Sequence, residues 1–328
     1  MRRSLLAAGC LVLAGCGSGS ASGHRAASAP AATGTPARHA ASPAPRLVAR
    51  RVGHLPAPVE LPAVATRGSA LLAIGGLDAA DASVASIVRV DGAGARVVGR
   101  LPSPLHDAAA ATAGSATLFV GGGEAGAGSD QILRVQPGGA TRAVGRLPAG
   151  ASDVAAAAVG STAYVVGGYT GAVPLRSIVA VRPSGAVDPV GWLPRPLRYA
   201  VVAAVGGRVL IAGGTSGTAA RREVLSFDPR TRRVRRIARL PRPVTHAAGA
   251  ALGGRFYVLG GRGDDLASQR SSVLAVDPGS GRVSRAGRLP EPLSDLSAGS
   301  FRDHVTVVGG RDAQGRARDE IWTLRARA

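Results

Sequence analysis

The sequence of 328 residues contains no lysine, two cysteines and few aromatic side chains. Both cysteines, Cys10 and Cys16, lie within the first sixteen residues. The rest of the chain therefore has no disulfide, no thiolate metal site and no cysteine nucleophile. Aromatic residues make up 3% of the chain, so a hydrophobic core has to be built mainly from alanine, valine and leucine.

The abundant residues disfavour helices. The chain has 47 glycines and 22 prolines, together 69 of 328 residues, whereas average usage gives roughly 12% for the two types combined. This density of helix breakers excludes a mostly helical protein. A hydrophobic content of 45% excludes wholesale disorder.

The charge of the chain is strongly positive. All 40 basic residues are arginine, against 20 acidic residues, for a formal net charge of +20. Such a surplus favours anionic partners such as acidic polymers or membrane headgroups. The alternative is a GC-rich genome, in which arginine codons replace lysine codons. In that case the positive charge has no function.

The arginines are concentrated between residues 215 and 243. The nine in this segment are Arg221, Arg222, Arg230, Arg232, Arg233, Arg235, Arg236, Arg239 and Arg242. One interpretation is a solvated outer edge that resists pairing with another chain. The other is a contact with an anionic wall polymer or lipid. No nucleic-acid partner is expected, because the basic residues are not interleaved with aromatic stacking platforms.

The N-terminus has the pattern of an export signal. Arg2 and Arg3 precede a short apolar stretch, 4–12, and the residues at 13–16 read Leu-Ala-Gly-Cys. These four residues resemble the bacterial lipoprotein box, which implies acylation of Cys16. We therefore predict a signal peptide over 1–16 and a disordered Gly/Ala/Ser/Pro tether over 17–45. The mature protein is expected on the outer face of the cytoplasmic membrane, held by its lipid.

A six-fold internal repeat dominates the remaining sequence. Leu-Pro pairs begin at Leu55, Leu101, Leu147, Leu193, Leu240 and Leu289. Gly-Gly pairs begin at Gly75, Gly121, Gly167, Gly213, Gly260 and Gly309. Both markers repeat at intervals of 46, 46, 46, 47 and 49 residues, which indicates six equivalent structural units.

Each unit is predicted to form four short strands. In the second unit we expect them at 108–113, 117–120, 131–135 and 141–146. The first strand is rich in alanine, which suits the innermost strand of a tapering blade. The sixth unit ends after its third strand, 321–324, whereas the segment 48–56 aligns with a fourth strand. We therefore predict that the N-terminal strand closes the last blade.

Four strands in a unit of this length resemble the Kelch repeat. The resemblance covers 46–328 as one domain and implies an all-β, six-bladed Kelch-like β-propeller. The glycine pair of the family is present, but its tryptophan in the fourth strand is replaced by aliphatic residues, so the repeat is divergent. The resemblance implies a binding or protein-interaction module whose partner is a protein or a carbohydrate. We also expect a monomer without a cofactor.

An enzyme is the alternative function. Six-bladed propellers of this family include a sialic acid mutarotase of the bacterial periplasm, which implies a sugar-modifying site at the channel mouth. A copper-radical oxidase resembling galactose oxidase is excluded, because its cofactor needs a cysteine and none follows Cys16.

Polar residues recur where each unit enters its innermost strand. The sixth residue after each conserved leucine is Leu61, Asp107, Asp153, Tyr199, His246 or Asp295. Such a ring of carboxylates and an imidazole would bind a polar small molecule or a cation. The alternative is that these side chains cap turns and satisfy backbone donors. No catalytic residue and no metal site are assigned.

Aromatic residues suggest a second candidate surface on the same face. Tyr169, Trp192 and Tyr199 follow one another along two neighbouring units. Exposed aromatic faces stack on sugars or anchor protein partners, and ordinary packing is the alternative.

Overall fold

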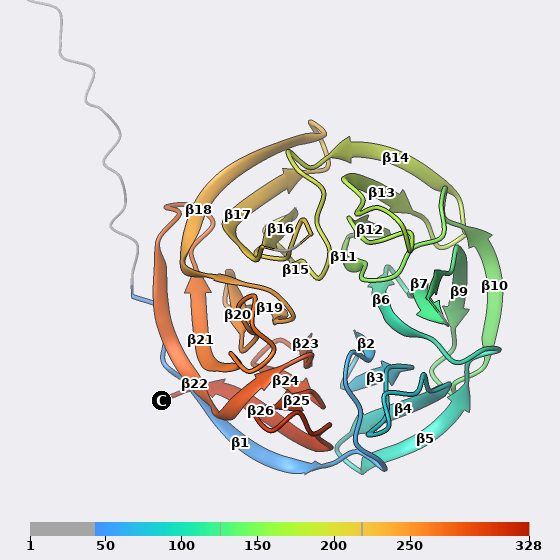
Figure 1. The fold of residues 1–328 in the computed structure, drawn as a ribbon, viewed down its shortest axis with the longest axis horizontal. Helices are drawn as coiled ribbons and strands as arrows, with labels where there is room; N and C mark the ends of the chain where they lie inside the picture. Colours follow the sequence, from blue (N-terminus) through green and yellow to red (C-terminus); the bar gives the residue numbers. More distant parts are fainter. Residues whose placement is uncertain (1–42, 125, 218, 328) are drawn as a thin grey trace, which may run out of the picture. The chain divides into compact units, whose positions relative to one another are not determined.

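The computed structural model describes residues 43–327 except 125 and 218, and this part of the chain forms six antiparallel sheets around a central axis (Figure 1). The predicted signal peptide and nearly all of the tether lie outside the described residues. Every regular element in the described part is a β-strand, and none of its segments is a helix able to span a membrane. The prediction of an all-β, six-bladed propeller is confirmed.

Blades 1 to 5 are each built from strands that are consecutive in sequence, with the first strand nearest the axis and the last on the outer wall. Blade 1 contains β2 (Ala63–Arg67), β3 (Ala70–Ile74), β4 (Ser86–Asp91) and β5 (Gly94–Arg100). Blade 2 contains β6 (His106–Ala113), β7 (Ala116–Glu124), β9 (Gln131–Val135) and β10 (Thr141–Arg146), with β8 (Ala127–Gly128) beside β7. Blade 3 contains β11 (Ala155–Val159), β12 (Thr162–Val166), β13 (Ser177–Val181) and β14 (Val187–Trp192). Blade 4 contains β15 (Val201–Val205), β16 (Arg208–Ala212), β17 (Arg221–Asp228) and β18 (Arg233–Val244). Blade 5 contains β19 (Ala248–Leu252), β20 (Arg255–Leu259), β21 (Arg270–Val276) and β22 (Val283–Ser294), with β25 (Arg311–Asp312) beside β22.

Blade 6 is completed by the N-terminal strand, as predicted. Its strands, from the inside outwards, are β23 (Ser297–Ser300), β24 (His304–Val308), β26 (Glu320–Ala326) and β1 (Leu47–His54). β1 pairs with β26 in antiparallel register, with Leu47 opposite Ala326 and His54 opposite Glu320. The Leu47 side chain is buried in the core between blades 5 and 6. The two ends of the described chain therefore close the ring by pairing with each other.

The inner strands consist of small residues because they converge on the axis. β11 is a run of four alanines and a valine, and a Cβ on Gly249 in β19 would lie 2.5 Å from the carbonyl oxygen of Val202 in β15. Further out, larger side chains fill the seams between neighbouring blades. Phe119 of β7, for example, packs in one cluster with Ile74 of β3. The core is thus distributed over the seams between blades, rather than placed at the centre.

The repeated glycine pair joins each blade to the next. The N–H of its second glycine donates, at 2.8 to 2.9 Å, to a carbonyl oxygen on the segment that leads to the following blade. In blades 4 and 5 this segment is the end of the long strand β18 or β22. The six bonds are Gly76 to Leu105, Gly122 to Ala151, Gly168 to Leu197, Gly214 to Val244, Gly261 to Leu293 and Gly310 to Val59. We call this bond the glycine clip. The sixth clip links blade 6 to blade 1 and closes the ring a second time.

Two outer strands are longer than predicted. We expected each fourth strand to end at its Leu-Pro pair, but β18 and β22 continue through this pair to Val244 and Ser294. The register of β18 against β17 shifts at this point: Glu223 lies opposite Arg239, but Arg221, two residues earlier, lies opposite Val244. Proline is tolerated there because an outermost strand has one edge with no ladder partner.

Candidate functional site at the channel mouth

Each blade contributes one residue in a left-handed backbone conformation to the mouth of the central channel. These rim residues are Leu61 (φ 55°), Asp107 (φ 53°), Asp153 (φ 56°), Tyr199 (φ 50°), His246 (φ 54°) and Asp295 (φ 58°). They are the six positions singled out in the sequence, and together they line a cavity of about 110 Å³. Each stands two residues after the carbonyl that accepts a glycine clip. The clips therefore fix where the rim residues enter the channel.

The left-handed turn connects neighbouring rim residues through their backbones. The N–H of Leu61 donates to the carbonyl of Asp295 at 2.7 Å, and the N–H of Asp295 donates to the carbonyl of His246 at 2.9 Å. Part of the residue choice is a backbone effect, because Asp and His tolerate this conformation better than most side chains. Leu61 and Tyr199 lack that tolerance, and their conformation costs about 1 kcal/mol or more each.

Tyr199 connects carboxyl and imidazole groups from different blades. Its hydroxyl donates to Oδ2 of Asp107 at 3.3 Å, and its ring stacks on His246 with the ring centroids 3.7 Å apart. Asp107 is 8% exposed. Burial, together with the negative charges of Asp153 and Asp295, holds the pKa of Asp107 well above its usual range. Asp107 therefore keeps its proton at a pH at which an exposed aspartate has lost it.

His246 is held as a neutral imidazole. Arg262 donates from Nη2 to Nε2 at 3.1 Å, and since a guanidinium has no acceptor, Nε2 carries the lone pair. Nδ1 then carries the proton and donates to Oγ1 of Thr245 at 3.0 Å. Burial and the charges of Arg262 and Arg198 lower the pKa of His246 to about 2. Both ring nitrogens are in use, so His246 acts as a platform for Tyr199 rather than as a base.

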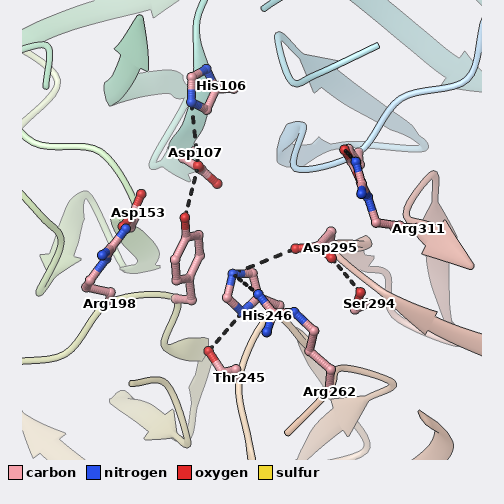
Figure 2. Close-up of polar contacts among 12 residues, drawn as sticks. His106, Asp107, Asp153, Arg198, Thr245, His246, Arg262, Ser294, Asp295 and Arg311 are labelled. Atoms are coloured by element: carbon pink, nitrogen blue, oxygen red, sulfur yellow. Dashed lines mark hydrogen bonds and ion pairs between the residues drawn. The ribbon is translucent and has the colours of Figure 1, made fainter. Parts of the chain in front are cut away.

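Three arginines, Arg198, Arg262 and Arg311, lie around the rim residues (Figure 2). Arg198 forms an ion pair with Asp153, and its guanidinium lies 3.9 Å from the ring centroid of Tyr169. Arg311 binds both carboxylate oxygens of Glu60, at 2.6 and 2.7 Å. Glu60 is 2% exposed, and burial raises its pKa despite the opposing effect of Arg311.

Asp295 is the third rim carboxyl. Its Oδ2 accepts a hydrogen bond from the Ser294 hydroxyl, and its Oδ1 lies 3.9 Å from Nε2 of His246, beyond hydrogen-bond distance. Burial raises the pKa of Asp295, while Arg262 and Arg311 oppose this shift. The rim carboxyls thus bond to side chains rather than capping backbone turns, and in the described part of the chain no group of three or more His, Cys, Asp or Glu residues has a geometry that holds a metal ion.

The other predicted surface residues lie further out. Tyr169 stands beside the mouth, where it pairs with Ser152 through an isolated bridge. Trp192 lies at the end of β14 on the outer wall, 60% exposed, and its ring is 5.8 Å from the Arg176 guanidinium. It lines a mostly apolar groove with Leu147 and Leu175. Tyr169 therefore lies beside the channel mouth, whereas Trp192 lies on the outer wall, so the two do not form one surface.

Sequence reasoning missed two of the site's arginines, Arg262 and Arg311. Each directly follows the glycine pair of its blade. Arg262 forms an isolated β-bridge with Thr245, the residue before the rim residue His246. An arginine directly after a glycine pair is the sequence pattern that would have identified them.

Most of the basic segment between 215 and 243 lies on β17 and β18, where Arg233, Arg235 and Arg236 are exposed.

Comparisons with known proteins agree with this architecture. A family model of the Kelch motif matches residues 196–241, which cover most of blade 4. A solved structure titled "Structure of YjhT" is similar with a TM-score of 0.71 and 14% sequence identity, over 84% of this chain and 99% of that chain. No curated protein sequence matches the chain. At this identity the structural likeness shows the fold.

Substitution of Asp107 by Asn should change how stability depends on pH. Above the unfolded pKa of about 3.9, the unfolded chain releases the Asp107 proton while the folded chain keeps it. Stability therefore falls as pH rises, by about 1.4 kcal/mol for each unit between the two pKa values. Asn cannot ionise, so Asp107→Asn should match the wild type near pH 4 and exceed it near pH 7 in urea unfolding. Parallel curves over this range would show that Asp107 ionises normally.

Proposed function

We propose that this six-bladed propeller, one of whose blades matches the Kelch motif, is a binding module whose ligand site is the channel mouth. The observation that carries this proposal is the convergence of six rim residues, one from each blade, on one polar cavity. A strained backbone that recurs at a shared site is a common sign of function. The volume of about 110 Å³ corresponds to roughly four water molecules at about 30 Å³ each, which suits the polar edge of one small ligand.

The chemistry of the rim favours a carbohydrate. The carboxylates of Asp153 and Asp295 accept hydrogen bonds from ligand hydroxyls, and the protonated Asp107 donates one. The surrounding arginines offset the negative charges, so the cavity does not require a cation. Leu61 and Tyr199 stand in blades 1 and 4, which face each other across the ring (Figure 1). They offer apolar surface to the C–H groups of a sugar ring.

A sugar-modifying activity of the mutarotase or epimerase kind is the second candidate. The observation that favours it is a pair of carboxyl groups in opposed environments on adjacent blades. Asp107 keeps its proton, whereas Asp153 forms an ion pair with Arg198. Such a pair can donate a proton to one sugar oxygen and remove a proton from another.

Binding should depend on the rim carboxyls. We expect a monosaccharide in a thermal-shift panel to raise the unfolding midpoint of the wild type by mass action. The increase should disappear in Asp107→Ala/Asp295→Ala but persist in Asp188→Asn, whose carboxylate pairs with Arg232 on the outer wall at 3.2 Å. Exchange spectroscopy of the anomeric protons of the bound sugar then separates an enzyme, which speeds their interconversion, from a binding module. Shifts that survive the double substitution, or no shift with any sugar, would contradict the carbohydrate assignment.

We propose further that the propeller is exported and attached to the outer face of the cytoplasmic membrane through an acylated Cys16. The support is the order of a basic start, a short apolar stretch and Leu-Ala-Gly-Cys at 13–16. The net charge of +20 would favour contact with an anionic wall polymer or lipid.

Cell fractionation tests this location. In Cys16→Ala the protein should lose its attachment to the membrane fraction, while Cys10→Ala should behave like the wild type. A Cys16→Ala product that is still processed and fully membrane-bound would rule out the anchor.

A further inference from the structure

Another concave site lies on the outer wall, between blades 4 and 5. This groove has a volume of about 540 Å³. Four arginines line it: Arg242 at the end of β18, Arg270 at the start of β21, and Arg285 and Arg288 on β22. No acidic side chain is among the lining residues. We call it the anion groove.

Two of the four guanidinium groups, those of Arg270 and Arg288, donate hydrogen bonds to uncharged oxygen atoms. Arg288 donates from Nε and Nη2 to Oγ of Ser271, at 3.3 and 3.2 Å. Arg270 donates to the carbonyl of Pro243. Burial and the charge of Arg242 lower the pKa of Arg270, although Asp264 opposes this shift. Among the described residues no carboxylate forms an ion pair with any of the four, and Asp264 acts on Arg270 only from beyond ion-pair distance.

The chain contains a matched groove one blade earlier. That groove, between blades 3 and 4, has a volume of about 450 Å³ and is also lined by four arginines: Arg195, Arg221, Arg236 and Arg239. Arg236 and Arg239 are equivalent to Arg285 and Arg288 by strand register. Arg236 lies opposite Leu225 in blade 4, and Arg285 lies opposite the corresponding Leu274 in blade 5. We call it the paired groove.

The two grooves differ in one acidic residue. In the paired groove Glu223 lies opposite Arg239, with Oε1 3.6 Å from Nη2. In the anion groove Ser272 lies opposite Arg288. Replacement of a carboxylate by a hydroxyl at this position leaves the anion groove with four arginines and no carboxylate in its lining.

We propose that the anion groove binds a ligand that carries several phosphate groups. A guanidinium fork matches two oxygens of a phosphate, and arginines from three strands can hold more than one such group. Val258 and Leu274 also line the groove, and charge-assisted hydrogen bonds beside apolar surface are stronger than in bulk water. The volume exceeds that of a single phosphate, so the ligand is a chain of phosphates or phosphate esters. The site is separate from the channel mouth and does not depend on the function proposed there.

Calorimetric titration with inorganic tripolyphosphate, at physiological salt, tests the proposal on the full propeller. Arg285→Gln/Arg288→Gln should lower the affinity at least about tenfold, because it removes charge-assisted bonds. Arg236→Gln/Arg239→Gln removes the same number of charges from the paired groove and should lower it no more than about twofold by screened long-range effects. Equal losses in both variants would show that only net charge matters and would overturn the site.

Exchange of the residues at positions 223 and 272 between the two grooves tests the role of the carboxylate by removing it from one groove and adding it to the other. Ser272→Glu should weaken tripolyphosphate binding, and Glu223→Ser should add a second binding site, seen as a doubled stoichiometry. Unchanged binding in both variants would overturn the proposal. Citrate bound as tightly as tripolyphosphate would overturn the assignment to phosphate.

Phosphatidylglycerol vesicles distinguish the sources of the phosphate. Cosedimentation that is lost in Arg285→Gln/Arg288→Gln but kept in Arg236→Gln/Arg239→Gln identifies lipid headgroups as a source. Binding of tripolyphosphate alone identifies a soluble or polymeric phosphate.

Discussion

The glycine clip is the contact on which the geometry of this propeller depends. In all six blades the N–H of the second glycine donates to a carbonyl oxygen at the entrance to the next blade. That carbonyl lies two residues before the rim residue. The contact that joins the blades therefore also places the candidate ligand site, and the rim is as regular as the repeat.

The clip explains why glycine recurs at the first position of the pair. This residue has φ between 60° and 67° in every blade, a conformation that glycine adopts without a steric cost. A Cβ added there would lie 2.2 to 2.6 Å from the same carbonyl oxygen, where no side chain fits. The pair is thus required by the spacing of the blades, whereas the rim and groove residues are free to differ between units.

The sequence repeat predicted the blades, their strand order and the clasp of β1 on β26, because all of these follow from a period and an alignment. It also predicted the positions of the rim residues. It did not predict the left-handed backbone at Leu61 or Tyr199, since neither side chain favours it. Arg262 and the unpaired arginines of the anion groove were missed for a different reason. Their roles depend on which residues face them across strands and blades, and a single sequence contains no such register.

A comparison of Gly213→Ala with Gly206→Ala tests the central claim most directly. The two glycines have nearly the same φ, 60° and 57°, but a Cβ on Gly213 would lie 2.2 Å from the Val244 carbonyl oxygen, whereas Gly206 has nothing within 4 Å. Both variants bear the left-handed cost of about 1–2 kcal/mol. In urea unfolding, Gly213→Ala should lose a further 1–3 kcal/mol or so from the forced displacement of the end of β18, which leads to blade 5. Equal losses of unfolding free energy in the two variants would contradict the account.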